Sequence, residues 1–275
     1  MSVVPAWVNI MGGPCSGHAL NRLISQRQYR SRIVHYGKML HQRGYVAATD
    51  GNLSVRLDDD RILITPTCTS KGDLRTGDIV TTNLDGKLVN GRKAVSSEVG
   101  MHLLIYKRRP DVRAIVHAHP PTATGFAAAG LPLNQPLVCE VVIGLGSIPL
   151  ARYGTPGTRE LADSLDPLVA DYDAILMSNH GVVTYGDTLE NAYMKMETVE
   201  HFAQIALVTH MLGRQKPLGE SEVQKLSIVR TNYRKALADA ALVSTPVSGN
   251  HNGTYLGKKR RPQHDDASGA AVRDA

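Results

Sequence analysis

The chain has 275 residues, of which 42% are hydrophobic, so it is long enough to bury one large core. Its formal net charge is +6, but the basic cluster at residues 258–261 supplies four of these charges and leaves the rest of the chain nearly balanced. No apolar run approaches the ~20 residues that cross a bilayer, and the N-terminus lacks the basic region of a secretory signal. We therefore expect a cytoplasmic protein with no membrane and no nucleic-acid partner.

Composition divides the chain into three regions. We expect residues 1–24 to form an N-terminal arm, residues 25–243 to form one folded domain, and residues 244–275 to be a disordered basic tail, because that tail has little to bury. The three cysteines are an odd number at unrelated spacings, which indicates reduced thiols rather than a disulfide framework.

The first part of the domain predicts one helix followed by two hairpins. Apolar positions at helical spacing predict a helix over residues 25–43, which Gly44 ends. Alternating apolar and polar residues then predict two β-hairpins, formed by residues 53–57 with 61–65 and by residues 79–83 with 87–89.

The second part of the domain alternates helices with strands. Ser96-Ser97-Glu98 opens a helix that Pro110 stops. The elements expected after it are a strand over residues 112–119, a helix over 122–129, a short buried strand over 138–143, a helix over 158–170, a strand over 173–178, and the longest helix, from Asp187 to Gly213. Hairpins and helices mix without regular βαβ repetition, so we expect an α/β fold in which helices cover both faces of a mostly antiparallel central sheet.

Histidines stand at the ends of two of these apolar strands. His117-Ala118-His119 closes one strand, and His180 follows the other. Side chains two apart on a strand point to the same face, so His117 and His119 can reach one ion. Three imidazoles suit a catalytic metal site that keeps one position open for substrate. The alternative is a chance pair of half-buried histidines.

Small polar segments supply candidates for the rest of a site. Glu98 could fold back toward the histidines from its helix start, although an acidic residue there also simply interacts with the helix dipole. Ser96 and Ser97 offer hydroxyl and N–H groups to an anion, or serve as N-caps. The loops at Gly51 and Thr67 could surround a phosphate with backbone amides, or be ordinary turns.

Together these segments resemble the class II aldolase and adducin family, and within it the L-fuculose-phosphate aldolase branch. The motifs that carry the resemblance lie in the family's order between residues 27 and 213: Gly51-Asn52-Leu53-Ser54, Ile64-Thr65-Pro66-Thr67, Ser96-Ser97-Glu98, His117-Ala118-His119-Pro120 and Asn179-His180-Gly181. The resemblance implies that residues 25–243 are a catalytic domain with a three-layer α/β/α sandwich. It also implies a homotetramer with active sites at the subunit interfaces.

The resemblance assigns roles to individual residues. It implies zinc, or manganese or cobalt in its place, on His117, His119 and His180. It implies that Glu98 is the movable carboxylate and acid/base. The substrate phosphate is expected on a set of small polar residues: Gly51, Asn52, Thr67, Ser96 and Ser97.

The implied activity is that of a class II, zinc-dependent aldehyde-lyase. Its substrate would be a ketose 1-phosphate, such as L-fuculose 1-phosphate or a deoxypentulose phosphate. Cleavage through a metal-stabilised enediolate would give dihydroxyacetone phosphate and an aldehyde. Glu98 would move the proton between the enediolate and dihydroxyacetone phosphate, for which we expect its pKa to be raised.

The chain departs from the family's pattern at two places. Thr67-Cys68 replaces the usual small Thr/Ser-Gly pair. The family's tyrosine that protonates the departing aldehyde oxygen across an interface has no counterpart in residues 137–141. Glu140, Tyr153 or a residue of the C-terminal region would then take that role.

Other functions share most of these motifs. A pentulose-5-phosphate 4-epimerase has Asp where this chain has Glu98, whereas a methylthioribulose-phosphate dehydratase or a decarboxylase uses the same metal scaffold. A Schiff-base aldolase would use a lysine, with Lys71 as the candidate. A non-catalytic adducin-like scaffold would lack the metal histidines, and all three are present.

Overall fold

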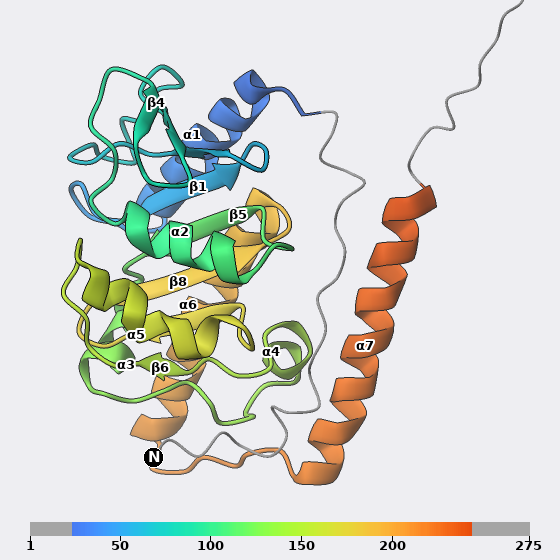
Figure 1. The fold of residues 1–275 in the computed structure, drawn as a ribbon. Helices are drawn as coiled ribbons and strands as arrows, with labels where there is room; N and C mark the ends of the chain where they lie inside the picture. The colour runs from blue at the N-terminus through green and yellow to red at the C-terminus, as the bar shows by residue number, and fades with distance from the viewer. Residues whose placement is uncertain (1–23, 244–275) are drawn as a thin grey trace, which may run out of the picture. The chain divides into compact units, whose positions relative to one another are not determined.

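The structure, a computed structural model, describes residues 24–243 of the chain (Figure 1). Its elements follow in the order α1 (Gln26–Gln42), β1 (Asn52–Arg56), β2 (Arg61–Ile64), β3 (Val80–Asn83), β4 (Leu88–Asn90), α2 (Val99–Arg108), β5 (Ala114–Ala118), α3 (Pro121–Ala128), α4 (Cys139–Gly144), β6 (Leu150–Ala151), α5 (Arg159–Val169), β7 (Ala174–Met177), β8 (Gly181–Gly186), α6 (Leu189–Met211) and α7 (Glu220–Val243). The predicted basic tail, and all of the predicted N-terminal arm except Ile24, lie outside the described residues.

Within the described residues, the strands form one sheet in the order β4-β3-β2-β1-β5-β8-β7-β6. Every neighbouring pair is antiparallel except β6 with β7. The two predicted hairpins are β1 with β2 and β3 with β4. The expectation of a mostly antiparallel central sheet is therefore confirmed, although the sequence did not predict β6 or β8.

Helices cover both faces of the sheet because successive strand residues place their side chains on opposite sides. On one face, α1, α3 and α6 pack on a core that includes Leu53, Val116 and Leu176. On the other face, α2 and α5 pack on a core that includes Ile115 and Ile175. Figure 1 shows α2 and α5 in front of the sheet and α6 behind it. The predicted three-layer α/β/α sandwich is confirmed.

The segment predicted as a buried strand over residues 138–143 is a helix instead. The run Val141-Val142-Ile143 is β-branched, but α4 spans Cys139–Gly144. Val141 and Leu145 lie one turn apart, and both are buried in the core shared with α1, α3 and α6. Their packing outweighs the β preference of the run, because such preferences are weak compared with burial.

The C-terminal helices differ from the prediction in their start and their length. The residue that caps the start of α6 is Thr188, and not Asp187 as predicted. The side chain of Thr188 accepts a hydrogen bond from the Asn191 N–H. α6 has 23 residues and α7 has 24, so the prediction that α6 is the longest helix was wrong. Apolar periodicity does not mark α7, because its buried side chains include Ser227 and Arg230.

Two further observations concern the cysteines and the possibility of a membrane span. Cys68 and Cys139 are unpaired and exposed, as the prediction of reduced thiols requires. Among the described helices, none combines the length and the apolar character that a membrane span requires.

Glu200 of α6 holds the start of α3, the helix that follows His119. Glu200 is 2% exposed, and its carboxylate accepts hydrogen bonds from the N–H groups of Thr122 (3.1 Å) and Ala123 (2.9 Å). A negative charge at a helix N-terminus satisfies N–H groups that have no partner within the helix and interacts favourably with the helix dipole. α6 thereby fixes the backbone directly after one of the candidate metal ligands.

Replacement of Glu200 by alanine should lower the free energy of unfolding by about 2–3 kcal/mol, because one buried and one partly buried N–H group lose their acceptor. The matched control is Glu197→Ala, one turn earlier on α6. Its partly exposed carboxylate pairs with Arg43, and its loss should cost less than about 1 kcal/mol. Urea unfolding of both variants measures the difference, and equal losses would contradict the role of Glu200.

Candidate metal centre

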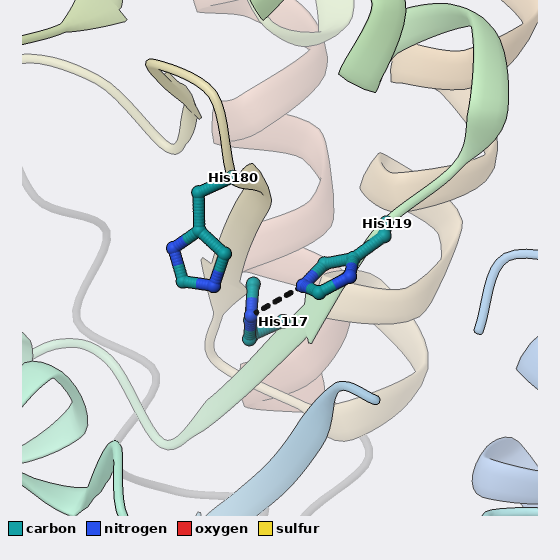
Figure 2. A group of neighbouring side chains, drawn as sticks. All are labelled: His117, His119 and His180. Carbon is teal, nitrogen blue, oxygen red and sulfur yellow. Dashed lines mark hydrogen bonds between the residues drawn. The ribbon is translucent and has the colours of Figure 1, made fainter. Parts of the chain in front are cut away.

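Three histidines converge where β5 ends. His117 is on β5, and His119 follows it, with its backbone N–H donating to Tyr45 O at 2.8 Å. His180 lies in the turn between β7 and β8, and the pairing of β8 with β5 brings this turn to the end of β5. Figure 2 shows the three rings directed toward one another from these two segments.

The separations between the rings suit a shared ion. The ring centroids are 4.8 to 5.1 Å apart. His117 Nε2 and His119 Nε2 are 3.1 Å apart, and the ligand atoms of these two residues and His180 lie within 4.8 Å of one another. Two nitrogens bound to one zinc at about 2.1 Å are about 3.4 Å apart in tetrahedral geometry. The predicted ligands are thus brought together at metal-binding distances.

The hydrogen bonds of the histidines direct ring nitrogens into the centre. His117 is fully buried, and its Nδ1–H donates to Val182 O at 2.9 Å, which leaves its Nε2 facing Glu98 and His119. Burial, together with the charges of His117 and His180, lowers the pKa of His119 to about 3, so this ring is neutral as a metal ligand must be. His180 Nδ1 is buried without a hydrogen-bond partner among the described residues. Buried polar atoms without partners are uncommon, and this donor set fits a divalent transition metal.

Glu98 lies at the start of α2 and faces the histidines, as predicted. Its carboxylate oxygens are 3.2 Å from His117 Nε2 and 3.1 Å from His180 Nε2. Burial acts to raise the pKa of Glu98, but the charge and hydrogen bond of His117, with those of His180, outweigh burial and lower it. The raised pKa expected for Glu98 is therefore not found while the carboxylate contacts the imidazoles.

Two glycines are required by the close packing around the rings. A Cβ at Gly181 would lie 2.5 Å from His119 Cδ2 and 2.7 Å from Ala118 O. Gly51 has a φ of +70°, and a Cβ there would lie 2.7 Å from His117 O. A larger residue at either position would displace a candidate ligand, so Gly51 stands next to the metal centre.

Asn52 lies between Glu98 and a histidine that the sequence motifs did not single out, His102. Asn52 Nδ2 donates to Glu98 Oε2 at 2.7 Å, and Asn52 Oδ1 is hydrogen-bonded to His102 Nε2. The i, i+4 spacing of Glu98 and His102 at the start of one helix was the available signal. Burial, with the charge of His117, lowers the pKa of His102 to about 3. A phosphate contact by Asn52 would use its second amide hydrogen.

The other predicted phosphate-binding residues lie on two neighbouring segments. Ser96 is buried, and its Oγ accepts a hydrogen bond from the Glu98 N–H at 3.3 Å, whereas Ser97 is exposed. The N–H of Thr67 donates to Ala94 O at 3.2 Å, which joins its loop to the segment that precedes Ser96. The loop at Thr67 and the start of α2 are therefore held near each other.

The candidates for aldehyde protonation are not brought to the histidines within one chain. Glu140 is exposed on α4, and Tyr153 is 58% exposed before α5. Within residues 24–243, neither makes a hydrogen bond or an ion pair with Glu98 or the three histidines.

Lys71 is enclosed in the fold rather than open to a substrate. It is 1% exposed, and its Nζ donates to Thr49 O and Thr69 O, both at 2.8 Å. Burial lowers the pKa of Lys71 to about 8. Because a Schiff base needs an amine with a free lone pair and a path to the substrate carbonyl, this arrangement argues against the Schiff-base alternative.

Comparison with known proteins agrees with this geometry. The sequence matches the family described as Class II Aldolase and Adducin N-terminal domain over residues 31–207. It is 34% identical over 200 residues to a 5-deoxy-D-ribulose 1-phosphate aldolase of Bacillus thuringiensis serovar kurstaki, covering 72% of this chain and 93% of that protein. It is 35% identical over 198 residues to a 3-oxo-tetronate 4-phosphate decarboxylase of Pectobacterium atrosepticum, covering 70% and 89%. Its fold is similar to that of a solved L-fuculose 1-phosphate aldolase, with a TM-score of 0.69, 30% identity, and coverage of 74% and 95%.

His119→Ala should bind a divalent metal at least roughly 100-fold more weakly than the wild type, because one of three imidazole ligands is lost. The matched control is His201→Ala, which removes an exposed imidazole from α6 and should retain the metal. Metal content after dialysis against a weak chelator measures both. An unchanged metal content in His119→Ala would contradict the assignment of His119.

The fold should lose stability as the pH falls from 6.5 toward about 3, because His102 takes up a proton in the unfolded chain but not in the fold. In this pH window, His102 lowers the free energy of unfolding by about 1.4 kcal/mol for each unit that the pH falls, or by about 2 kcal/mol between about pH 7 and about pH 5. His102→Gln has no titrating ring, so its free energy of unfolding should fall by less over the same interval. Urea unfolding at both pH values tests this, and parallel losses in the two proteins would argue against a neutral buried imidazole.

Proposed function

Because the chain belongs to the class II aldolase and adducin family, we propose that it is a metal-dependent aldehyde-lyase that cleaves a ketose 1-phosphate to dihydroxyacetone phosphate and an aldehyde. The observation that carries the proposal is the convergence of His117, His119 and His180, two of which also contact the buried carboxylate of Glu98. A non-catalytic scaffold has no use for this donor set, so an enzyme is the better explanation.

The proposed substrate resembles L-fuculose 1-phosphate or a deoxypentulose phosphate. Two of the similar proteins are named as aldolases of 5-deoxy-D-ribulose 1-phosphate and L-fuculose 1-phosphate. Both sugars carry a carbonyl beside the phosphorylated carbon, and cleavage of the C3–C4 bond of either gives dihydroxyacetone phosphate. They differ in the aldehyde half, which would be acetaldehyde or lactaldehyde.

We assign the metal as zinc, with manganese or cobalt as alternatives, held by His117, His119 and His180. The Nε2 of His117, which faces the other ligands, and the neutral ring of His119 support this assignment. When bound, such a metal supplies Lewis-acid polarisation of the substrate carbonyl.

Glu98 is the proposed acid/base. As the C3–C4 bond of the ketose breaks, the C4 hydroxyl gives its proton to a second acid/base group and becomes the aldehyde carbonyl. The electron pair of the broken bond remains on C3, and Glu98 donates the proton that completes dihydroxyacetone phosphate. The contacts with His117 and His180 lower the pKa of Glu98, whereas burial acts to raise it. A carboxylate that moves away from the imidazoles and stays buried loses the contacts that lower its pKa, so its pKa rises toward that of a proton donor.

The substrate phosphate is proposed to bind where the loops at Gly51 and Thr67 approach the start of α2. The hydrogen bond from Thr67 to Ala94 supports this, because it holds one loop beside Ser96 and Ser97. Backbone N–H groups at a helix start and the second amide hydrogen of Asn52 are suitable donors to a phosphate: the full proposed set is Gly51, Asn52, Thr67, Ser96 and Ser97.

Decarboxylation of 3-oxo-tetronate 4-phosphate is the second candidate function. Loss of CO₂ from that acid leaves the same electron pair beside a carbonyl and also gives dihydroxyacetone phosphate. No aldehyde forms, so no second group is needed to take the proton of a C4 hydroxyl, or to return it to the aldehyde oxygen in the reverse reaction. The absence of a tyrosine from residues 137–141 favours this candidate, as does a relative of that name.

We further propose a cytoplasmic homotetramer with active sites at subunit interfaces. The exposure of Glu140 and Tyr153 supports it, because either side chain could then serve the histidines of a neighbouring copy. Light scattering would give about four chains per particle, and a monomer would contradict this arrangement.

The most direct test of the function is a screen of ketose 1-phosphates and 3-oxo-tetronate 4-phosphate for release of dihydroxyacetone phosphate. We expect release from a ketose 1-phosphate that a chelator abolishes and added zinc, manganese or cobalt restores. Release only from the 3-oxo acid would select the decarboxylase, and release unaffected by a chelator would contradict both.

Glu98→Gln should retain the metal but exchange the C3 proton of dihydroxyacetone phosphate at least roughly 100-fold more slowly, because an amide cannot take up and return that proton. Exchange into deuterated water, followed by NMR, measures the rate. Asp50→Asn is the matched control, since its carboxylate is 44% exposed and 3.5 Å from His119 Nδ1. An unchanged exchange rate in Glu98→Gln would remove Glu98 from its assigned role.

A further inference from the structure

A continuous chain of hydrogen bonds joins the interior of the protein to the carboxylate of Glu98. It runs from Tyr106 OH to Ser54 Oγ (2.8 Å), from Ser54 Oγ to His102 Nδ1 (2.6 Å), from His102 Nε2 to Asn52 Oδ1, and from Asn52 Nδ2 to Glu98 Oε2 (2.7 Å). All five residues are buried, and Ser54 and His102 are fully so. Solvent therefore does not compete for these hydrogen bonds in the interior.

The chain of hydrogen bonds has a single direction. A carboxylate only accepts, so Asn52 turns its NH₂ group toward Glu98 and its Oδ1 toward His102. Asn52 Oδ1 needs a donor, so the proton of His102 is on Nε2. Because a neutral imidazole has one N–H, His102 Nδ1 accepts from the hydroxyl of Ser54, which in turn accepts from the phenol of Tyr106.

His102 also connects the two elements that carry the site. Asn52 and Ser54 are two apart on β1, so they present their side chains on one face, and His102 of α2 bonds to both. In the pairing of β1 with β5, Asn52 lies opposite His117. The imidazole of His102 thus ties the helix that begins at Glu98 to the strand beside the metal ligands.

We propose that His102 is a positioning residue, which fixes the amide of Asn52 with its N–H toward Glu98 and so holds this carboxylate in place against the histidines. Without the donor at His102 Nε2, Asn52 Oδ1 loses its hydrogen bond, and the amide of Asn52 is free to shift away from the carboxylate of Glu98. The effect on catalysis rests on the proposed function, whereas the direction of the hydrogen bonds does not.

Two variants at position 102 separate positioning from packing. His102→Leu removes both hydrogen bonds, whereas His102→Gln keeps an N–H donor near the place of Nε2. We expect exchange of the C3 proton of dihydroxyacetone phosphate to slow roughly 10- to 100-fold in His102→Leu and to stay within about tenfold of the wild type in His102→Gln. Ile105→Val is the matched control, because it removes a methylene from a fully buried residue of α2 and should lower stability without slowing exchange.

Coupling to Asn52 provides a sharper criterion than the single variants. If His102 acts through Asn52, then His102→Leu added to Asn52→Ala should slow exchange by less than about threefold further, with metal content unchanged. The proposal would be overturned if the double variant slowed exchange by the product of the two single-variant factors. A wild-type exchange rate in His102→Leu would also overturn it.

The location of the proton on His102 tests the proposal without any measurement of activity. Nitrogen-15 NMR of the full chain labelled in histidine, assigned with His102→Gln, should show a proton on Nε2 and a bare Nδ1. A proton on Nδ1, or a charged ring at neutral pH, would overturn the proposal for any substrate. If this tautomer is found but the wild type exchanges no proton of dihydroxyacetone phosphate, the proposed function fails and the positioning geometry stands.

Discussion

The antiparallel pairing of β5 with β8 is the constraint on which the site depends. It brings the turn that carries His180 to the end of the strand that carries His117. The register is set by packing, because Val116 and Ala118 are buried on one face of β5 and Ile115 on the other. A slip of one residue would move every side chain of β5 to the opposite face and take His117 out of the site. The hydrophobic core therefore determines the geometry of a polar centre.

The electrostatics of the site follow from burial. Imidazoles enclosed in the fold lose hydration, which disfavours their charged forms, and the carboxylate of Glu98 opposes this by favouring a positive charge near it. The pKa of Glu98 is lowered and that of His117 is raised by their mutual contact. The arrangement favours positive charge beside Glu98, which a bound divalent cation would supply. In the proposed mechanism, a Glu98 that leaves this contact and stays buried would have a higher pKa.

Much of this arrangement could be predicted from the sequence, because its signals are local. The hairpins, the strand before His119 and the helix after Glu98 have clear periodicity and clear ends. The features that the sequence did not predict depend on tertiary packing. Residues 138–143 have a strand-like sequence but are a helix, since the burial of Val141 is satisfied in that form. His102 was missed because its role depends on β1, which is far away in sequence and brought close only by the sheet.

We propose that three imidazoles from two segments hold one divalent ion. Anomalous scattering from crystals grown with zinc or cobalt tests it most directly. The account predicts one peak per chain at about 2.0–2.1 Å from a ring nitrogen of each of His117, His119 and His180. A peak on other residues, with these three rings left without a metal between them, would contradict it.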